Sequence, residues 1–387
     1  MGATTIGISG DKFTINGKEA FLLGVSYFDA FNWHASDLDE LKARGYNLIR
    51  VWLDWEDRGL FDADGNLTWE QPLAELVEAS DARGLVVDVT MLDGSLSFGP
   101  SNREKAVRQA VSALKGKPNV IFNIMNAHDS GEHALSHTQV KTLIEAVVEE
   151  DPDAIITVSS SPGHIIRGKT LQKTRVDEEL SAGITVFTPH LPRTSDWYSR
   201  TEERVTRIKN HFKDTARMVP VYLQEEARRG LAKLNPTQDE FLHAAKAALS
   251  AGAAAWIFHT AAGFDLAGGS LFSQLNAVEK STIDALPKAI FGSDTNLTAT
   301  TSMASDTSTK STLSEDLASA PQQQPNSSEQ SPSVSAATLS ARASGATYYV
   351  DTNHPSASDS NPGTEVLPWK TIQKPANMLV AGDTVYI

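Results

Sequence analysis

Several charged and polar side chains that could do chemistry follow apolar segments typical of β-strands. In chain order these side chains are Arg50, Asn126 with His128, His190, and Glu225. A carboxylate can attack an electrophilic carbon, and a cationic neighbour keeps it ionised. Amide, imidazole and guanidinium groups hydrogen-bond hydroxyl groups. If the segments form one parallel barrel, these side chains meet where its strands end, and we expect a sugar-binding site there.

Tryptophan rings offer flat surfaces on which pyranose rings could stack. Trp256 lies in a further apolar segment, whereas Trp33, Trp55 and Trp197 lie on segments predicted as loops. Exposed aromatic side chains on loops often serve binding. We expect all four to contact sugar, although a tryptophan within an apolar segment can equally belong to the core.

Eight apolar, β-rich segments carry these side chains, and helical patterns separate most of them. The segments are FLLGVSYF, NLIRVWLDW, GLVVDVTML, NVIFNIMN, AIITVSSS, ITVFTPH, VPVYLQEE and AAAWIFHT. Strands that are apolar throughout and alternate with helices predict a parallel sheet covered by helices. Eight such units favour an α/β fold of the (β/α)₈ (TIM) barrel type over an open sheet. An opening hairpin with an Asn16-Gly17 turn would close the bottom of the barrel.

Three predicted helix starts carry a hydroxyl residue with Glu or Gln three positions later. They are Thr68, Ser101 and Ser136. In this capping box the two side chains satisfy backbone N–H groups that the helix leaves unpaired.

The composition changes near residue 293. Residues 293–345 are rich in Ser, Thr, Ala and Gln and hold almost no large apolar side chain, so burial there cannot offset the entropy of ordering. We predict a flexible linker there, between a barrel domain over residues 1–292 and a terminal segment over residues 346–387. That segment, with its YYV, PWKTIQKP and GDTVYI, resembles the start of a right-handed parallel β-helix domain, and we interpret it as a truncated one.

Composition excludes several classes of partner. The chain has 34 Lys and Arg against 48 Asp and Glu, a formal net charge of −14, which opposes binding to nucleic acid or anionic lipid. No run approaches the roughly 20 consecutive apolar residues of a membrane span. The absence of cysteine excludes disulfides, thiolate nucleophiles and zinc–sulfur sites. We therefore expect neither a nucleic-acid nor a membrane partner.

Taken together, these motifs resemble clan A of the glycoside hydrolases, which includes family 5 cellulases and mannanases. The resemblance covers roughly residues 11–292 and rests on five motifs in the family's order. They are Arg50 in NLIRVW, Asn126 in NVIFNIMN, His190, Glu225 in PVYLQE and Trp256 in AAAWIF. It implies a retaining β-glycoside hydrolase with no cofactor, secreted or displayed at the cell surface, although the N-terminus lacks the features of a signal peptide.

The resemblance also implies a role for each residue. Glu225 would be the nucleophile, with its neighbour Glu226 as a rival that faces the other way. Asn126 would bond the sugar 2-hydroxyl, and Trp256 would lie beneath the sugar at the cleavage site. Arg50 and His190 would orient the nucleophile. The acidic surface disfavours polyuronates, so neutral glucans or mannans are the expected substrates.

One position departs from the family pattern. The general acid/base glutamate is expected after Asn126, but the chain has Ala127. An alanine transfers no proton, and losing general acid–base help costs about 10²–10⁴-fold in rate. We expect a disabled variant of an active enzyme that binds glycan with little or no turnover. The alternatives are a glycan-binding barrel that never catalysed, and an activity located in the terminal domain.

A histidine-rich segment raises the question of a metal. His133 and His137 are four positions apart, but Ser136 is predicted to begin a helix, which separates the two. We interpret the segment as a solvated loop and predict no metal site.

Overall fold

The computed structural model describes residues 3–55, 58–93, 100–131, 134–292, 347–352, 354, 357–359, 361, 368–378 and 384–386. The chain divides into two units, Met1–Thr301 and Ser302–Ile387. All the site residues that the sequence predicts belong to the first unit. The predicted linker at 293–345 lies outside the described residues.

The first unit is a (β/α)₈ barrel, as predicted. Its largest sheet has the order β10-β9-β8-β5-β4-β16-β15, and every pair in it is parallel. The ring closes through a parallel β11–β14 pair and a parallel bridge between Phe187 and Val221. The barrel strands are β4 (Leu22–Asp29), β5 (Leu48–Trp52), β8 (Val86–Leu92), β9 (Val120–Met125), β10 (Ile156–Thr157), β11 (Ser159–Ser160), β14 (Thr188–Pro189), β15 (Tyr222–Leu223) and β16 (Ala255–Phe258).

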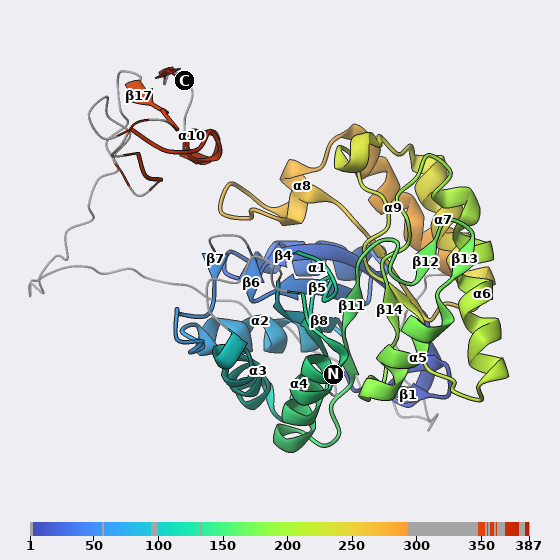
Figure 1. Cartoon of the computed structure of the whole chain (residues 1–387). Helices are drawn as coiled ribbons and strands as arrows, with labels where there is room; N and C mark the ends of the chain where they lie inside the picture. Colours follow the sequence, from blue (N-terminus) through green and yellow to red (C-terminus); the bar gives the residue numbers. More distant parts are fainter. Residues whose placement is uncertain are drawn as a thin grey trace, which may run out of the picture. The chain divides into compact units, whose positions relative to one another are not determined.

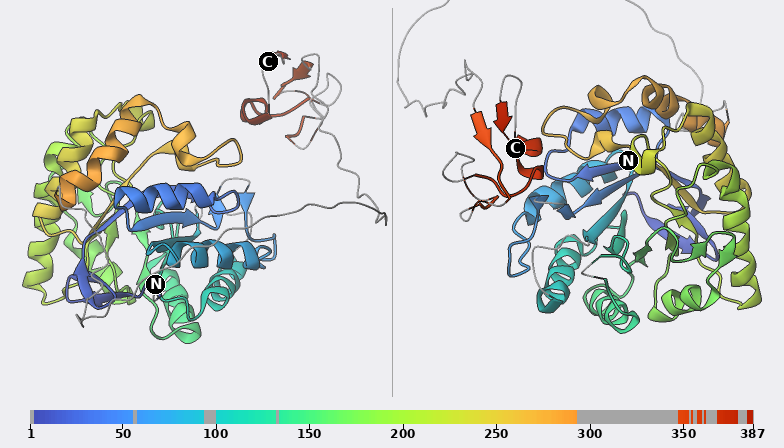
Figure 2. Two further views of the ribbon diagram at one scale, coloured as in Figure 1. Left: turned by 180° about the vertical axis from the view of Figure 1, so that it is seen from behind. Right: turned by 45° about the horizontal axis from the view of Figure 1, so that its top comes forward.

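Helices surround the strands on the outside of the barrel (Figures 1 and 2). They are α1 (Ala35–Arg44), α2 (Glu70–Asp81), α3 (Pro100–Leu114), α4 (His137–Glu150), α5 (Lys173–Ala182), α6 (Thr201–Asp214), α7 (Gln238–Ser250), α8 (Leu271–Gln274) and α9 (Ala277–Phe291). Short 3-10 turns are η1 (Tyr198–Arg200), η2 (Leu231–Lys233) and η3 (Ala261–Gly263). Two small antiparallel pairs, β6 (Asp54–Trp55) with β7 (Arg58–Gly59) and β12 (Ile166–Arg167) with β13 (Thr170–Leu171), lie in loops. Within the described part of the chain, no helix is both long and apolar enough to cross a membrane.

The predicted hairpin is part of a three-stranded antiparallel sheet. Its strands are β1 (Ile6–Ser9), β2 (Lys12–Ile15) and β3 (Lys18–Ala20). Asn16 and Gly17 form the β2–β3 turn with φ angles of 53° and 76°, in the left-handed region that this turn requires. Phe13 is fully buried and packs edge-on against Tyr222 of the barrel interior, 6.4 Å between ring centroids. The sheet thus covers one end of the barrel.

Successive residues along the barrel strands belong in turn to two different hydrophobic clusters. One residue in two points into the barrel, and these form the cluster that Phe13 covers: Leu22, Leu48, Val86, Ile121, Val186, Tyr222, Ala255 and Ile257. The residues between them form a larger cluster with the helices. This alternation decides which polar side chains reach the barrel mouth.

Only one of the three predicted capping boxes forms as expected, at Ser136 and Gln139 of α4. The prediction at Thr68 is wrong, because its hydroxyl donates to the backbone oxygen of Leu60 and α2 begins after Trp69. The helix α3 begins at Pro100, before Ser101.

The described part of the second unit holds a parallel pair, β17 (Thr347–Tyr349) with β18 (Thr384–Tyr386), and a short helix, α10 (Gln373–Met378). Within it the rings of Tyr348 and Trp369 stack 4.7 Å apart.

Candidate active site

Arg50 is the centre of the polar cluster where the barrel strands end. It lies on β5 and is fully buried. Its Nη1 lies 2.5 Å from Oε1 of Glu225, and its Nη2 donates to Oδ1 of Asn126 at 3.0 Å. Its Nε donates to the hydroxyl of Thr90 on β8 at 3.0 Å. One guanidinium therefore fixes side chains from three other strands or strand ends.

Glu225 follows β15 and accepts a hydrogen bond from a second guanidinium, that of Arg193. Nη2 of Arg193 lies 3.0 Å from its Oε2, and Nδ1 of His190 lies 3.9 Å from the same oxygen. Burial alone would raise the pKa of Glu225, but the cationic groups around it hold that pKa well below its ordinary value. Burial lowers the pKa of His190 to about 3, so His190 is neutral at pH 7 and the two guanidiniums supply the charge. Glu225 is therefore an ionised, oriented carboxylate.

A buried polar layer lies directly beneath this carboxylate, and sequence reasoning missed it. Oδ2 of Asp88 lies 3.7 Å from Nε of Arg50 and accepts from the hydroxyl of Tyr222 at 2.8 Å and from Nε2 of Gln224 at 2.5 Å. Burial raises the pKa of Asp88 to about 6. A polar residue in the apolar run GLVVDVTML, on the same face as Val86, is the signal that could have identified it.

Glu226 and Trp256 form a separate pair on the helix side of the barrel wall. The indole N–H of Trp256 donates to Oε2 of Glu226 at 2.5 Å, and Thr201 of α6 donates to its other oxygen at 2.9 Å. Trp256 is only 1% exposed. On β16 it alternates with Ala255 and Ile257, which point into the barrel. The structure thus places Trp256 in the outer core, where no sugar could stack on it.

The aromatic surface near Arg50 comes from other residues. The guanidinium of Arg50 lies 5.0 Å from the ring of Trp52 and 5.4 Å from that of Phe28. Phe264 stacks on Phe28 with ring centroids 4.5 Å apart and is half-buried. Any side chain at Gly263 would overlap the backbone of Ser26, so η3 lies tight against β4 and brings Phe264 onto Phe28. Of these three rings only that of Phe264 is not fully buried, and the guanidinium of Arg228 lies 4.9 Å from its centroid.

Among the other predicted subsite residues, Trp197 and His128 make their contacts outside this cluster. Trp197 is buried and packs edge-on against Phe241, 5.7 Å between centroids. Trp33 is half-buried against the outer core. The backbone of Trp55 forms part of β6, but its side chain lies outside the described set. His128 turns away toward Glu179 of α5, with 3.2 Å between Nε2 and Oε1.

Ala127 has an unusual backbone. Its φ angle is 45°, in the left-handed region that residues with a Cβ rarely adopt. Its N–H donates to the hydroxyl of Ser159 on β11 at 3.3 Å. In the preceding residue, Nδ2 of Asn126 donates a hydrogen bond to Oδ1 of Asp93 at 3.5 Å. The side chain of residue 127 itself cannot transfer a proton, and the carboxyl that accepts this hydrogen bond from Asn126 is that of Asp93.

Comparison with known proteins reveals one family. The profile described as Cellulase (glycosyl hydrolase family 5) matches residues 7–257. No curated protein matches the chain.

Solved structures with a similar fold have low sequence identity. A β-glucanase from Saccharophagus degradans, solved with cellotetraose, is 13% identical; the match covers 74% of this chain and 94% of that one, with a TM-score of 0.54. The catalytic domain of a mannanase from Streptomyces sp. SirexAA-E is 16% identical, with 74% and 93% covered and a TM-score of 0.52. A longer structure from Bacteroides vulgatus is 13% identical; the match covers 67% of this chain and only 55% of that one, with a TM-score of 0.51.

Proposed function

Because this chain belongs to glycosyl hydrolase family 5, we propose that its barrel binds a β-linked glycan over Glu225 and that Glu225 is the nucleophile of a retaining mechanism. The observation that carries the proposal is the guanidinium of Arg50, which holds Glu225 and Asn126 side by side. A buried carboxylate with a lowered pKa is always ionised at neutral pH, as a nucleophile must be.

The first chemical step needs two groups. An oxygen of Glu225 forms a bond to the anomeric carbon while the glycosidic C–O bond breaks, and the departing oxygen must take up a proton. In the second step a base removes a proton from water, which attacks the same carbon and releases Glu225. Ala127 stands where one side chain would serve as both acid and base. With no donor there, a sugar alkoxide leaves poorly, and we expect tight binding with slow turnover.

The neutral β-linked glucans and mannans are the proposed ligands. The compared structures include a β-glucanase with cellotetraose and a mannanase. The net charge of −14 disfavours acidic glycans. We further propose that residues 1–292 act as the glycan-binding module, that residues 293–345 link it to a β-helix-like domain beginning near residue 346, and that the protein works outside the cell.

A glycosyl-enzyme trap tests the nucleophile without needing the acid. Dinitrophenolate leaves without protonation, so dinitrophenyl β-cellobioside or β-mannobioside should give a burst of about one equivalent per chain. Glu225→Gln should abolish the burst. Glu226→Gln is the matched control, because Glu226 points to the helix side of the barrel wall, and it should keep the burst. Azide needs no base, so it should speed the second step and yield a β-glycosyl azide.

A second variant separates an impaired enzyme from a binding protein. If Ala127→Glu raises hydrolysis of a natural glycan by at least about 10²-fold, residue 127 is the acid/base position. Saturable glycan binding with no burst and no gain from Ala127→Glu would favour the second candidate, a non-catalytic glycan-binding barrel. The left-handed φ of Ala127 favours that candidate, because a glutamate there would also be strained.

A further inference from the structure

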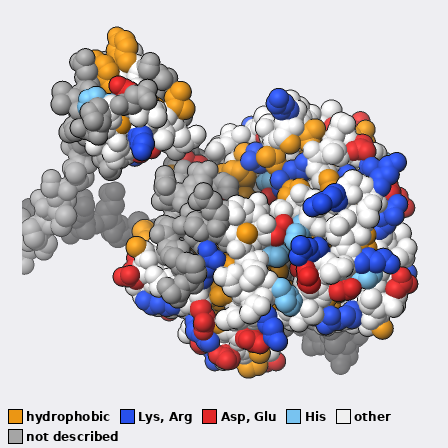
Figure 3. All heavy atoms as spheres, in the orientation of Figure 1, with side chains coloured by type: hydrophobic (Ala, Val, Ile, Leu, Met, Phe, Trp, Pro, Cys, Tyr) orange, Lys and Arg blue, Asp and Glu red, His pale blue; other side chains and the backbone are white. Residues whose placement is uncertain are grey.

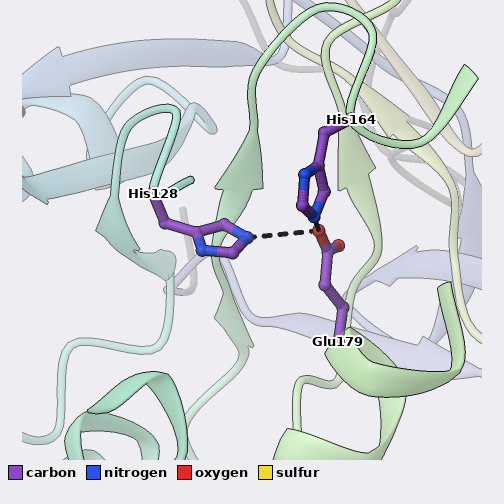
Figure 4. Close-up of side chains that lie close together, drawn as sticks. All are labelled: His128, His164 and Glu179. Atoms are coloured by element: carbon purple, nitrogen blue, oxygen red, sulfur yellow. Dashed lines mark hydrogen bonds and ion pairs between the residues drawn. The ribbon is translucent and has the colours of Figure 1, made fainter. Parts of the chain in front are cut away.

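We propose that His128, His164 and Glu179 form a binding site for a transition-metal ion, for which Zn²⁺ has the best-matched chemistry. His128 lies in the loop after β9, His164 in the turn after β11, and Glu179 on α5. One ligand atom from each of the three lies within 4.8 Å of the other two. Figure 4 shows both imidazole rings directed at the carboxylate. Two histidines with one glutamate are a ligand set that zinc accepts.

The spacing of the ligand atoms fits a metal. Oε1 of Glu179 lies 3.2 Å from Nε2 of His128 and 3.9 Å from Nε2 of His164. Zinc–nitrogen and zinc–oxygen bonds of about 2.0–2.2 Å place neighbouring ligand atoms of a tetrahedron roughly 3.3–3.5 Å apart. The first distance is close to that range and the second is longer, while the histidine nitrogens lie within 4.8 Å of each other, so the ligand atoms would draw closer together when the ion binds.

Asp129 accepts the hydrogen bond that a metal-bound histidine usually donates from its other ring nitrogen. Its Oδ2 lies 2.9 Å from Nδ1 of His164. The N–H and the hydroxyl of Ser161 each donate to Asp129 at 2.6 Å, which fixes the carboxylate. A hydrogen bond from Nδ1 leaves the lone pair of His164 on Nε2, the nitrogen that faces Glu179. The tautomer that a metal needs is therefore selected in advance.

The burial of Glu179 independently supports a bound cation. Glu179 is 3% exposed, and its Oε2 has no hydrogen-bond partner among the described residues. A buried carboxylate oxygen without a partner is costly, and a bound cation would relieve that cost.

A cavity leaves room for a fourth ligand. About 280 Å³ of space lies against the three side chains and is also lined by Arg175, Glu178 and His137. Figure 3 shows histidine side chains at the surface of the barrel unit among acidic and basic ones. Three protein ligands with an open position typically hold a water or an anionic ligand. The ion would tie two successive β/α units together, because His128 lies in the loop after β9, which also carries Asn126 and Ala127, and the other two ligands belong to the next unit.

This site differs from the one that the sequence suggested and that we predicted not to bind metal. His133 lies outside the described residues, and His137 is exposed on the cavity wall. The three ligands lie far apart in the chain, with 51 positions between His128 and Glu179, so no short motif marks them.

Zinc binding to the full chain tests the proposal. After removal of metals with a chelator, titration calorimetry with Zn²⁺ should give one site per chain. Glu179→Gln and His164→Gln should each weaken binding by at least about 100-fold. Asp129→Asn should weaken it by about 10–100-fold, because Asp129 orients His164 without contacting the ion. Circular dichroism of each variant checks that it is folded.

His211→Gln is the matched control. His211 is also buried, its Nε2 lies 2.8 Å from Oδ1 of Asp177, and its Nδ1 lacks a partner in the described structure, but it has no second histidine. Its loss should leave the zinc affinity unchanged. Absence of a zinc site in the folded wild-type chain would overturn the proposal. So would equal effects of His211→Gln and Glu179→Gln.

Discussion

Nη1 of Arg50 and Oε1 of Glu225 lie 2.5 Å apart, although 175 positions separate the two residues in the chain. Closure of the barrel creates this contact, and the low dielectric around it makes each partner depend on the other. Because Glu225 is 8% exposed, removal of the guanidinium would leave a buried carboxylate with less compensation.

The first prediction concerns the stability of this pair. Arg50→Met should lower the free energy of unfolding by about 3–5 kcal/mol, because it breaks a buried ion pair by removing one partner. Arg83→Met removes a surface pair with Asp39, whose side chain is 63% exposed, and should cost no more than about 1 kcal/mol. Urea denaturation at pH 7 measures both values. Similar losses for the two variants would contradict the assigned burial of the pair.

The second prediction concerns the backbone at Ala127. Glycine adopts positive φ without the steric cost that a Cβ imposes, so Ala127→Gly should stabilise the protein by about 1 kcal/mol. Ala216 has a φ of 54° and lies in the loop after α6, so Ala216→Gly is a positive control. Thermal and urea unfolding measure the change. A destabilised Ala127→Gly beside a stabilised Ala216→Gly would show that residue 127 is not in the left-handed region.

The third prediction concerns pH. Burial, and then the neighbouring charge of Asp93, raise the pKa of Asp54 to about 7. The folded protein therefore holds a proton that the unfolded chain releases near pH 4, so this group lowers stability as pH rises from about 4 to 7. The loss should reach up to about 4 kcal/mol. Asp54→Asn should remove that slope and make the protein more stable than wild type at pH 8.

Asp39→Asn provides a control of opposite sign. A hydrogen bond from Arg83 lowers the pKa of Asp39, so its contribution is present above its ordinary pKa and is lost as pH falls. Unfolding free energies measured from about pH 2 to pH 8 distinguish the two slopes, because the contribution of Asp39 changes only below its ordinary pKa of about 4. A stability difference between Asp54→Asn and wild type that does not change with pH would refute the raised pKa.

The fourth prediction separates two aromatic residues. Phe264→Ala should weaken binding of cello- or manno-oligosaccharides by about 3–10-fold, because a half-buried ring at the Arg50 cluster would be lost. Trp256→Phe should leave affinity within about twofold but lower stability by about 1–3 kcal/mol, because Glu226 would lose a buried hydrogen-bond donor. Calorimetric titration and urea denaturation give the two readouts. A large affinity loss in Trp256→Phe would restore the sugar platform that the sequence suggested.

Local patterns were enough to predict the barrel. Apolar segments, turn residues such as Asn16-Gly17 and the capping box at Ser136 each depend on a few neighbouring residues. The rule that parallel strands end at one mouth then brought Arg50, Asn126 and Glu225 together without any knowledge of their contacts. The identity of Ala127, on which the proposed loss of the proton donor rests, is likewise a property of the sequence alone.

Side-chain direction and long-range contact were decided only by the tertiary structure. Trp256 lies on the right strand but at an outward position, because the strand alternation places Ala255 and Ile257 inside. Arg193 reaches Glu225 from a loop, and His128 contacts Glu179 on α5, the helix of the next β/α unit. Such pairs have no fixed spacing in the chain, since it is barrel closure that determines which loop ends become neighbours.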